Sequence, residues 1–260
     1  MWFTREKKAT TPFLNPKTTK NFCGTLYNVP HFYEVNMMDN NKKTVIEKRI
    51  MKVGENLKKN NMEFYYAETK SDVAAIVKGL IKEGDVITHG GSVSMLECGV
   101  RELISSPEYR YIDRSKAQSP EEIKQVYRDA FSADVYISSA NAITEDGVLY
   151  NVDGNSNRIA AIAFGPDSVI IIAGYNKIVR DLDEAEVRVK TEAAPPNCVR
   201  LECPTYCRET GECVSLSKAG HQISDGCSGD GRICCNYLIS AQQRHKGRIK
   251  VIIVGEELGY

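Results

Sequence analysis

Residues 62–91, "MEFYYAETKSDVAAIVKGLIKEGDVITHGG", contain the pattern that decides the fold class. An aromatic, β-rich run at 62–68 is followed by a helical pattern that begins with Ser71 as its cap and stops at Gly84. A short apolar strand at 85–91 comes directly after it. Two strands joined through a helix form a βαβ unit with parallel strands. The sequence therefore predicts an α/β fold.

The same alternation extends in both directions along the chain. Upstream, the apolar residues of 42–59 recur at spacings of three and four, which indicates one face of a helix. Downstream, helical patterns alternate with strand-like runs, the helices at 92–106, 119–133 and 181–193 and the strands at 109–113, 134–140, 168–174 and 248–258. This order predicts a mostly parallel sheet with helices on both faces.

Three segments differ from this alternation. Residues 142–155 predict an antiparallel hairpin, with Asp146-Gly147 as a turn signal. Residues 1–40 show no period and contain three prolines, which predicts an irregular arm before a single domain at 41–260. That domain includes a cysteine-rich segment at 198–235.

Composition excludes several classes of partner. The chain has 260 residues, of which 42% are hydrophobic, so it can fill a sizeable core. Lys and Arg together number 34, as do Asp and Glu, so no net field favours nucleic acid or an anionic membrane. The first residues contain no apolar leader, and no apolar run reaches the length of a membrane span. These features predict a cytoplasmic protein.

The first candidate site is the Gly90-Gly91-Ser92-Val93-Ser94 stretch. It stands where a strand gives way to a helix, so its backbone N–H groups and two hydroxyls can face an anion at the carboxyl edge of the sheet. It lacks the third glycine of a dinucleotide motif and the lysine of a Walker loop. A tight turn capped by serines explains the same residues equally well.

The second candidate site lies in residues 138–166, with Lys177 on the same rim. Its polar residues Asn141, Thr144, Asp153 and Asn157 are candidates for substrate binding, although turns use Asn and Asp for geometric reasons alone. Three charged residues are the catalytic candidates. Glu145 can act as a base or nucleophile, Arg158 can hold a carboxylate or phosphate, and Lys177 follows an apolar strand onto the same rim. A solvated loop lysine is the alternative for Lys177.

The nine cysteines are distributed unevenly. Cys23 and Cys98 are isolated and predict small buried apolar residues, whereas seven cysteines fall between positions 198 and 235. An odd number of cysteines without an export signal argues against a full disulfide framework. Clustered thiols then favour a soft metal, either zinc or an iron–sulfur cluster, with a disulfide or free thiols as the alternatives.

Three stretches together resemble the LUD, or lactate utilization, domain proteins. They are "ITHGGSVSMLECGV" (87–100), "SSANAITEDGVLYNVDGNSNRIAAIAFGPDSVIIIAGYNKIVRDLDEAEVRVKTEAAPPN" (138–197) and "CRETGEC…GCSGDGRIC" (207–234). The resemblance covers roughly residues 40–260. It implies a fold like that of glucosamine-6-phosphate deaminase, ribose-5-phosphate isomerase and the CoA transferases, whose Gly/Ser-rich loop contacts a phosphate or acyl-CoA.

The resemblance also implies a pathway. Family members take part in operons that oxidise L-lactate to pyruvate together with iron–sulfur partner proteins. This chain lacks a tandem Cys-x-x-Cys-x-x-Cys run, so it looks like the stand-alone branch common in anaerobes. The implied ligand is a small anionic metabolite or a phosphate-containing cofactor, bound between the Gly/Ser loop and the hairpin.

The stand-alone branch has a cysteine tail that implies four metal ligands. The tail has the form Thr-Pro-Cys, five residues, Cys, two residues, Cys, six residues, Cys. This chain fits it at Cys207, Cys213, Cys227 and Cys234, but the middle gap has 13 residues and Tyr206 replaces the proline. The longer gap costs about 1–2 kcal/mol in loop closure. Thiolate binding of a structural metal supplies about 10 kcal/mol or more, so the insertion need not abolish the site.

Three functions remain open from the sequence. The first is a redox-associated protein of 2-hydroxy acid oxidation that binds an anionic metabolite. The second is acyl transfer, because "TEDG" at 144–147 faintly resembles the Glu-Asn-Gly of CoA transferases, which would make Glu145 the nucleophile. The third is a metabolite-sensing module without catalytic activity.

Overall fold

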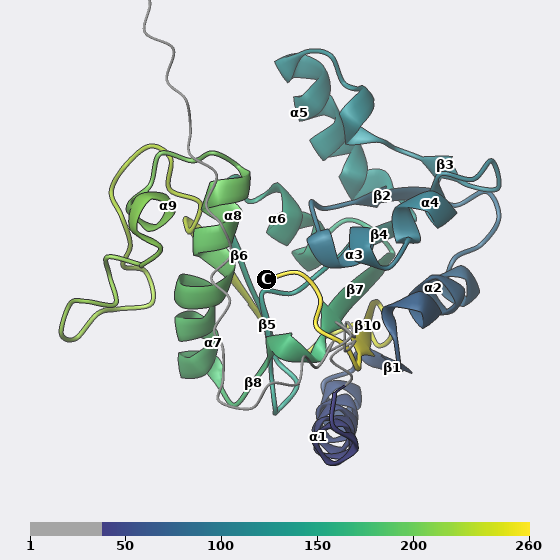
Figure 1. The fold of residues 1–260 in the computed structure, drawn as a ribbon. Helices are drawn as coiled ribbons and strands as arrows, with labels where there is room; N and C mark the ends of the chain where they lie inside the picture. Colours follow the sequence, from purple (N-terminus) through teal and green to yellow (C-terminus); the bar gives the residue numbers. More distant parts are fainter. Residues whose placement is uncertain (1–37) are drawn as a thin grey trace, which may run out of the picture. The chain divides into compact units, whose positions relative to one another are not determined.

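A computed structural model describes residues 38–260, which form one compact unit. The predicted arm at 1–40 therefore falls, up to position 37, outside the described residues. Within the described part, a parallel sheet of six strands and a second, mixed sheet of four strands make up the framework (Figure 1). None of the helices from residue 38 onward has the length and apolar character needed to cross a membrane.

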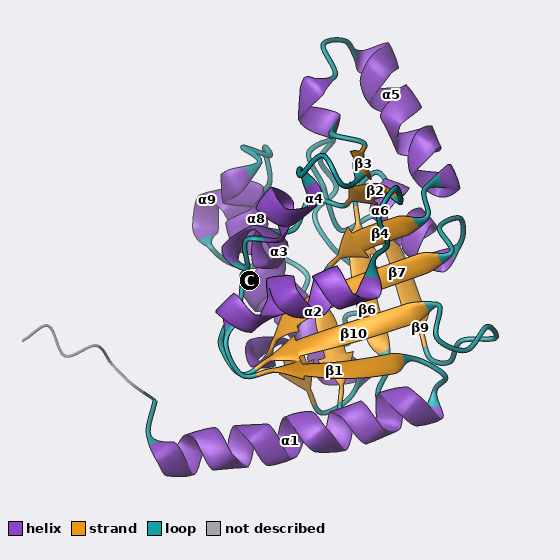
Figure 2. Cartoon of the chain, turned by 90° about the vertical axis from the view of Figure 1, so that its right-hand side faces the viewer, coloured by secondary structure: helices purple, strands orange, loops and turns teal. Residues whose placement is uncertain are grey.

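The parallel sheet confirms the predicted α/β class. Its strand pairs are all parallel, as Figure 2 shows for the stacked arrows above α1. In spatial order the strands are β1 (Glu63–Ala67), β10 (Ile249–Val254), β7 (Ser168–Gly174), β4 (Val135–Ser138), β2 (Val86–His89) and β3 (Arg110–Tyr111). The strand nearest the C-terminus, β10, therefore lies between β1 and β7.

Helices cover both faces of this sheet, which explains why its central strands are continuously apolar. Along β7, Ile171 packs into one core cluster, whereas its neighbours Ile170 and Ile172 pack into the other, because successive strand residues face opposite sides. The first cluster includes residues of α1 (Asn40–Lys59) and α6 (Asn157–Ala163). The second includes residues of α2 (Val73–Leu80), α3 (Val93–Glu97) and α4 (Val100–Ile104).

Capping residues define where the helices begin. The hydroxyl of Ser119 accepts a hydrogen bond from the Glu122 N–H, and Pro120 opens α5 (Pro120–Asp129), so this helix begins at the start of the predicted segment 119–133. The predicted start and stop of α2 are wrong. The backbone N–H of Thr69 bonds to the Asp72 carboxylate at 2.9 Å, so the turn begins before Ser71. The helix ends at Leu80, and Gly84 forms a later turn at a φ of 83°.

The predicted hairpin is confirmed but belongs to a larger sheet. Strands β5 (Ala142–Thr144) and β6 (Leu149–Asp153) pair antiparallel. The short strand β8 (Ile178–Val179) adds to β5, and β9 (Asn236–Ser240), which follows the cysteine-rich segment, adds to β6. Neither β9 nor α6 is predicted from the sequence. Strand β9 ties the end of the cysteine-rich segment to the hairpin.

A long helical rod packs against the second sheet. It consists of α7 (Leu182–Arg188), a π-helical turn (Val189–Ala193) and α8 (Ala194–Arg200). Pro195 and Pro196 lack backbone N–H groups and crowd the carbonyls four residues earlier, which accounts for the wider turn before them. A short helix, α9 (Tyr206–Thr210), then leads into the rest of the cysteine-rich segment.

Candidate functional site

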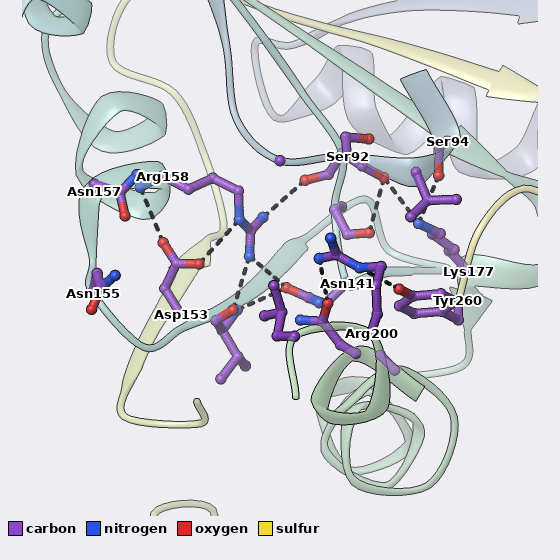
Figure 3. Close-up of a pocket in the computed structure, with 18 of the residues that line it drawn as sticks. Ser92, Ser94, Asn141, Asp153, Asn155, Asn157, Arg158, Lys177, Arg200 and Tyr260 are labelled. Atoms are coloured by element: carbon purple, nitrogen blue, oxygen red, sulfur yellow. Dashed lines mark hydrogen bonds and ion pairs between the residues drawn. The ribbon is translucent and has the colours of Figure 1, made fainter. Parts of the chain in front are cut away.

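A pocket of about 300 Å³ opens at the carboxyl edge of the parallel sheet. One wall of its lining comes from residues that follow three parallel strands: Gly91–Ser94 after β2, Ser139–Asn141 after β4, and Lys177 in the turn after β7. The second sheet and α8 supply the opposite wall, as Figure 3 shows. This edge is where open α/β sheets bind ligands. We call this cavity the edge pocket.

The Gly/Ser loop (residues 90–94) leaves room for the edge pocket mainly because its side chains are small. A Cβ atom on Gly90 would stand 2.9 Å from the Tyr136 hydroxyl and 3.1 Å from the Arg158 side chain, so only glycine fits there. The Ser92 hydroxyl accepts the Met95 N–H at 3.2 Å and is therefore a helix cap. Gly91, Ser92 and Ser94 line the pocket, whereas Gly90 supports it from behind.

Lys177 lies at the inner wall of the edge pocket (Figure 3). Only 4% of the residue is exposed, and its Nζ donates to the hydroxyls of Ser94 and Ser139, each at 3.0 Å. Burial, followed by the positive charges of Arg188 and Arg158, lowers the pKa of this amine to about 7. The solvated-lysine alternative is thereby wrong for this residue.

Arg158 holds the pocket wall together. Its Nε donates to Asp153, its Nη1 to Ser139 and Asn151, and its Nη2 to Asn141 and Val152, all between 2.8 and 3.2 Å. These bonds use all five N–H donors of the guanidinium. Arg158 therefore contributes positive charge and order to the pocket, with no donor left over for a ligand.

The predicted polar residues divide into two groups. Asn141, Asp153 and Asn157 line the edge pocket, and the Asp153 carboxylate also accepts the N–H groups that begin α6. Thr144 and Glu145 do not line it. Thr144 bonds within its own turn, and Glu145 pairs with Arg49 at 2.9 Å and with Lys52 at 2.8 Å, which fastens the hairpin to α1.

Two further cations line the edge pocket that the sequence patterns did not single out. The Arg200 Nε donates to the Tyr260 hydroxyl at 2.6 Å, and its Nη2 donates to Asn197 at 2.6 Å. The Arg114 guanidinium lies over the Tyr127 ring, 5.9 Å from its centroid. Both arginines are exposed. In the sequence, Arg200 could have been linked to the pocket only through its position three residues after Asn197, which puts both side chains on one face of a helix.

The four predicted metal ligands gather around one small cavity. Cys207, Cys213, Cys227 and Cys234 all line it, and Cys198 joins them from α8. Cys207 Sγ lies 3.6 Å from Cys198 Sγ. Arg232 connects the loops by donating to the carbonyls of Cys234, Cys227 and Ser224. We call this arrangement the thiol cavity.

All eight cysteines between residues 38 and 260 are free thiols. Burial, together with the neighbouring cysteines, raises the pKa of Cys198 and of Cys234 to about 12. Among these residues, no group of three or more His, Cys, Asp or Glu side chains is placed closely enough to hold a metal ion. The thiols therefore share a cavity without converging on a single ion-sized point. Cys98 is buried, as predicted for an isolated cysteine.

A third cavity, which we call the connecting cavity, adjoins both sites and shares lining residues with each. It shares Asn141, Asp153 and Asn197 with the edge pocket, and Arg232 and Cys234 with the thiol cavity. Cys203 and Cys235 line only this connecting cavity. His221, in the inserted loop, lies 3.6 Å from Glu186, away from the thiol cavity lining.

This combination defines an α/β protein with a cationic pocket at the carboxyl edge of a parallel sheet and a thiol-rich segment beside it. A family model of the LUD domain matches residues 50–254. The chain therefore belongs to the LUD domain family, as the sequence resemblance indicates. No curated protein matches the sequence.

Solved structures resemble parts or most of the chain. A DUF162 family protein from Deinococcus radiodurans is 14% identical with a TM-score of 0.44, covering 82% of this chain and 98% of that one. The eIF2B delta of Chaetomium thermophilum is 17% identical (TM-score 0.30), covering 44% and 49%. The Pyrococcus horikoshii OT3 translation initiation factor eIF-2B is 24% identical (TM-score 0.28), covering 43% and 47%. At these values the likeness transfers no function.

Proposed function

We propose that this LUD-family protein binds a small anionic metabolite of 2-hydroxy acid oxidation in its edge pocket. Membership of the family supports a role related to lactate utilization. The carboxylate of lactate or pyruvate and the phosphate of a cofactor share the chemistry that this pocket would recognise.

The excess of positive charge in the edge pocket carries the proposal. Three arginines, Arg114, Arg158 and Arg200, line it, and Asp153 is the only acidic side chain among the lining residues of the described chain. Asp153 is already paired with Arg158 at 3.2 Å. The protein as a whole has no net charge, so this concentration of cations is local. Its volume of about 300 Å³ suits a small metabolite.

Calorimetric titration tests the ligand proposal with three probes: L-lactate, pyruvate and inorganic phosphate. We expect at least one to bind, and Arg200→Ala to weaken that binding by about tenfold or more, because one charge-assisted hydrogen bond is worth about 1.5–3 kcal/mol. Arg128→Ala is the matched control, since Arg128 is exposed on α5 and does not line the pocket. Equal effects of both substitutions, or binding of none of the probes, would contradict the proposal.

For the thiol cavity we propose a bound zinc ion or iron–sulfur cluster held by Cys207, Cys213, Cys227 and Cys234. The donor set fits, because four soft thiols line one cavity. The sequence spacing favours the cluster slightly, since Cys207-x5-Cys213 lacks the tight Cys-x2-Cys pair that is usual in zinc ribbons. A cluster would add one-electron chemistry next to the connecting cavity, whereas zinc would be structural.

Metal and sulfide analysis of anaerobically purified protein tests this second site. We expect a stoichiometric metal that Cys234→Ser removes and Cys203→Ser retains, because Cys203 lies outside the thiol cavity. Iron with acid-labile sulfide and a visible absorption band would identify a cluster, and zinc without colour would identify a structural ion. Protein that contains neither metal, even after anaerobic reconstitution, would overturn the proposal.

A further inference from the structure

The hydrogen-bonding of Lys177 leaves one position of its nitrogen without a protein partner. A charged lysine has three N–H donors, but in the described chain the Nζ has two acceptors, the hydroxyls of Ser94 and Ser139. Each hydroxyl donates its own hydrogen to a backbone carbonyl, that of Ser94 to Leu258 and that of Ser139 to Ala140. Two N–H groups of an uncharged amine match these two acceptors. The third position then carries a lone pair.

The surroundings of Lys177 oppose a positive charge on it. Burial is the largest cause of its lowered pKa of about 7, followed by the charges of Arg188 and Arg158. Glu97 acts weakly in the opposite direction. No salt bridge joins Lys177 to any carboxylate between residues 38 and 260. At neutral pH a large share of this amine is therefore uncharged, whereas a surface lysine with a pKa near 10.4 is almost fully charged.

An uncharged amine among cations suits a particular kind of ligand. Arg200 and Arg114 can neutralise a carboxylate, and Lys177 lines the same cavity. Arg200 has guanidinium N–H groups beyond the two bonds to Tyr260 and Asn197. A buried amine next to cationic groups is an activated nucleophile toward carbonyl carbon. The matching ligand has a carboxylate next to a carbonyl group.

We propose that Lys177 captures a 2-oxo acid as a covalent imine in the edge pocket. The Nζ lone pair attacks the carbonyl carbon next to the carboxylate, a C=N bond replaces the C=O bond, and the carbonyl oxygen leaves as water with the two amine protons. No electrons are gained or lost, so the step needs no redox partner. The proposal rests on the edge pocket being an anion site and names 2-oxo acids as its substrate class. L-lactate, which lacks the carbonyl, would bind without reacting.

Reductive trapping tests this inference on the intact protein. The protein is incubated with cyanoborohydride and one of three probes, glyoxylate, pyruvate or L-lactate, and the products are mapped by peptide mass spectrometry. We expect the two 2-oxo acids, but not lactate, to modify Lys177 on the order of tenfold or more faster than exposed lysines. With pyruvate, the mass gain should equal that of pyruvic acid minus one oxygen atom. Labelling should rise as the pH passes about 7.

Two substitutions provide the controls. Lys177→Arg keeps a cationic hydrogen-bond donor and should abolish the adduct. Lys250→Arg should retain it, because Lys250 is also partly buried with a lowered pKa but bonds to Ser168 and Gly247, outside the edge pocket. Peptide mass spectrometry of the unsubstituted protein also shows directly whether Lys177 is labelled faster than the other lysines, without the use of any variant.

The outcomes separate this inference from the proposed function. Calorimetric binding of pyruvate that depends on Arg200, with no preferential labelling of Lys177 by either 2-oxo acid, would overturn the imine and leave the anion site intact. Absence of both binding and labelling would remove both. Labelling of Lys177 no faster than that of exposed lysines would also contradict the imine.

Discussion

At the scale of single residues, Arg158 shows how a residue type can be predicted while its task is not. The sequence places an arginine beside a run of turn residues, which suggests a ligand-binding guanidinium. The fold instead brings acceptors from Ser139, Asn141 and Asn151 around it. These partners lie up to 19 positions away, so no local pattern could identify them. The positive charge of Arg158 could be predicted from the sequence, but not that all of its N–H donors are bonded to other residues of the protein.

Arg158→Lys should therefore act mainly on stability. Lysine has three donors where arginine has five, so at least two largely buried acceptors lose their partner. We expect the free energy of unfolding to fall by about 2–4 kcal/mol, measured by urea denaturation. Arg128→Ala, an exposed change, should alter it by less than about 0.5 kcal/mol. A stable Arg158→Lys protein that had lost only ligand affinity would instead assign Arg158 to ligand binding.

Glu145 provides a second test at this scale. Hydrogen bonds from Lys52 and Arg49 lower the pKa of its carboxyl group. The folded-state pKa lies below the usual 4.5, so the stabilising effect is present above that pH and is lost as the pH falls through the folded value. Glu145→Gln should lower the free energy of unfolding by about 0.5–1 kcal/mol at neutral pH and by progressively less in acid. Urea denaturation at neutral and at acidic pH measures the difference.

The same variant tests the acyl-transfer alternative. Because Glu145 does not line the edge pocket, Glu145→Gln should leave ligand affinity there unchanged. Glu55→Gln is its control, since Glu55 is exposed on α1, the helix that contains Arg49 and Lys52, and has no ion pair among the described residues. Exchange between acyl-CoA and free acid that required Glu145 would show that this carboxylate reacts, and would contradict a purely structural role.

At the scale of elements, the periodic segments were predictable and their assembly was only partly so. Strands β2, β4, β7 and β10 follow from apolar runs, and the hairpin follows from Asp146-Gly147. Strand β9 was not predicted because its short sequence, "NYLIS", does not indicate a strand by itself. It becomes a strand by pairing with β6. The second sheet is built from segments far apart in the chain, so its existence is a long-range property.

Gly147 tests how the hairpin is fixed to α1. Its φ is 82°, and a Cβ atom there would stand 2.6 Å from the Leu57 backbone nitrogen. Gly147→Ala therefore combines backbone strain with a clash against a helix backbone, and should cost about 2–3 kcal/mol in the free energy of unfolding. Gly79→Ala is the opposite case, because Gly79 is helical with open space around it. It should be stabilising by up to about 1 kcal/mol. Similar unfolding midpoints for both variants would contradict this contact.

At the scale of the whole molecule, the edge pocket depends on elements from across the chain. Its floor comes from the ends of the parallel strands, whereas its far wall comes from α8, which also provides Cys198 to the thiol cavity. Charge and cysteine content were visible in the sequence. The shared wall was not, because it arises from helix packing against the second sheet.

Because α8 lines both the edge pocket and the thiol cavity, removal of the proposed metal should affect both sites. The two core clusters that cover the parallel sheet contain no residue of 203–235, and only Cys234 of that stretch packs against the third cluster. The stretch therefore depends largely on its hydrogen bonds and on the proposed metal. Metal removal should therefore increase hydrogen exchange in 203–235 and at α8, while β7 and β10 keep their protection. Affinity for the anion should fall as well, since Asn197 and Arg200 belong to α8. Unchanged exchange at α8 with a lost metal would show that the two sites are independent, and uniform loss of protection would show that the metal supports the whole fold.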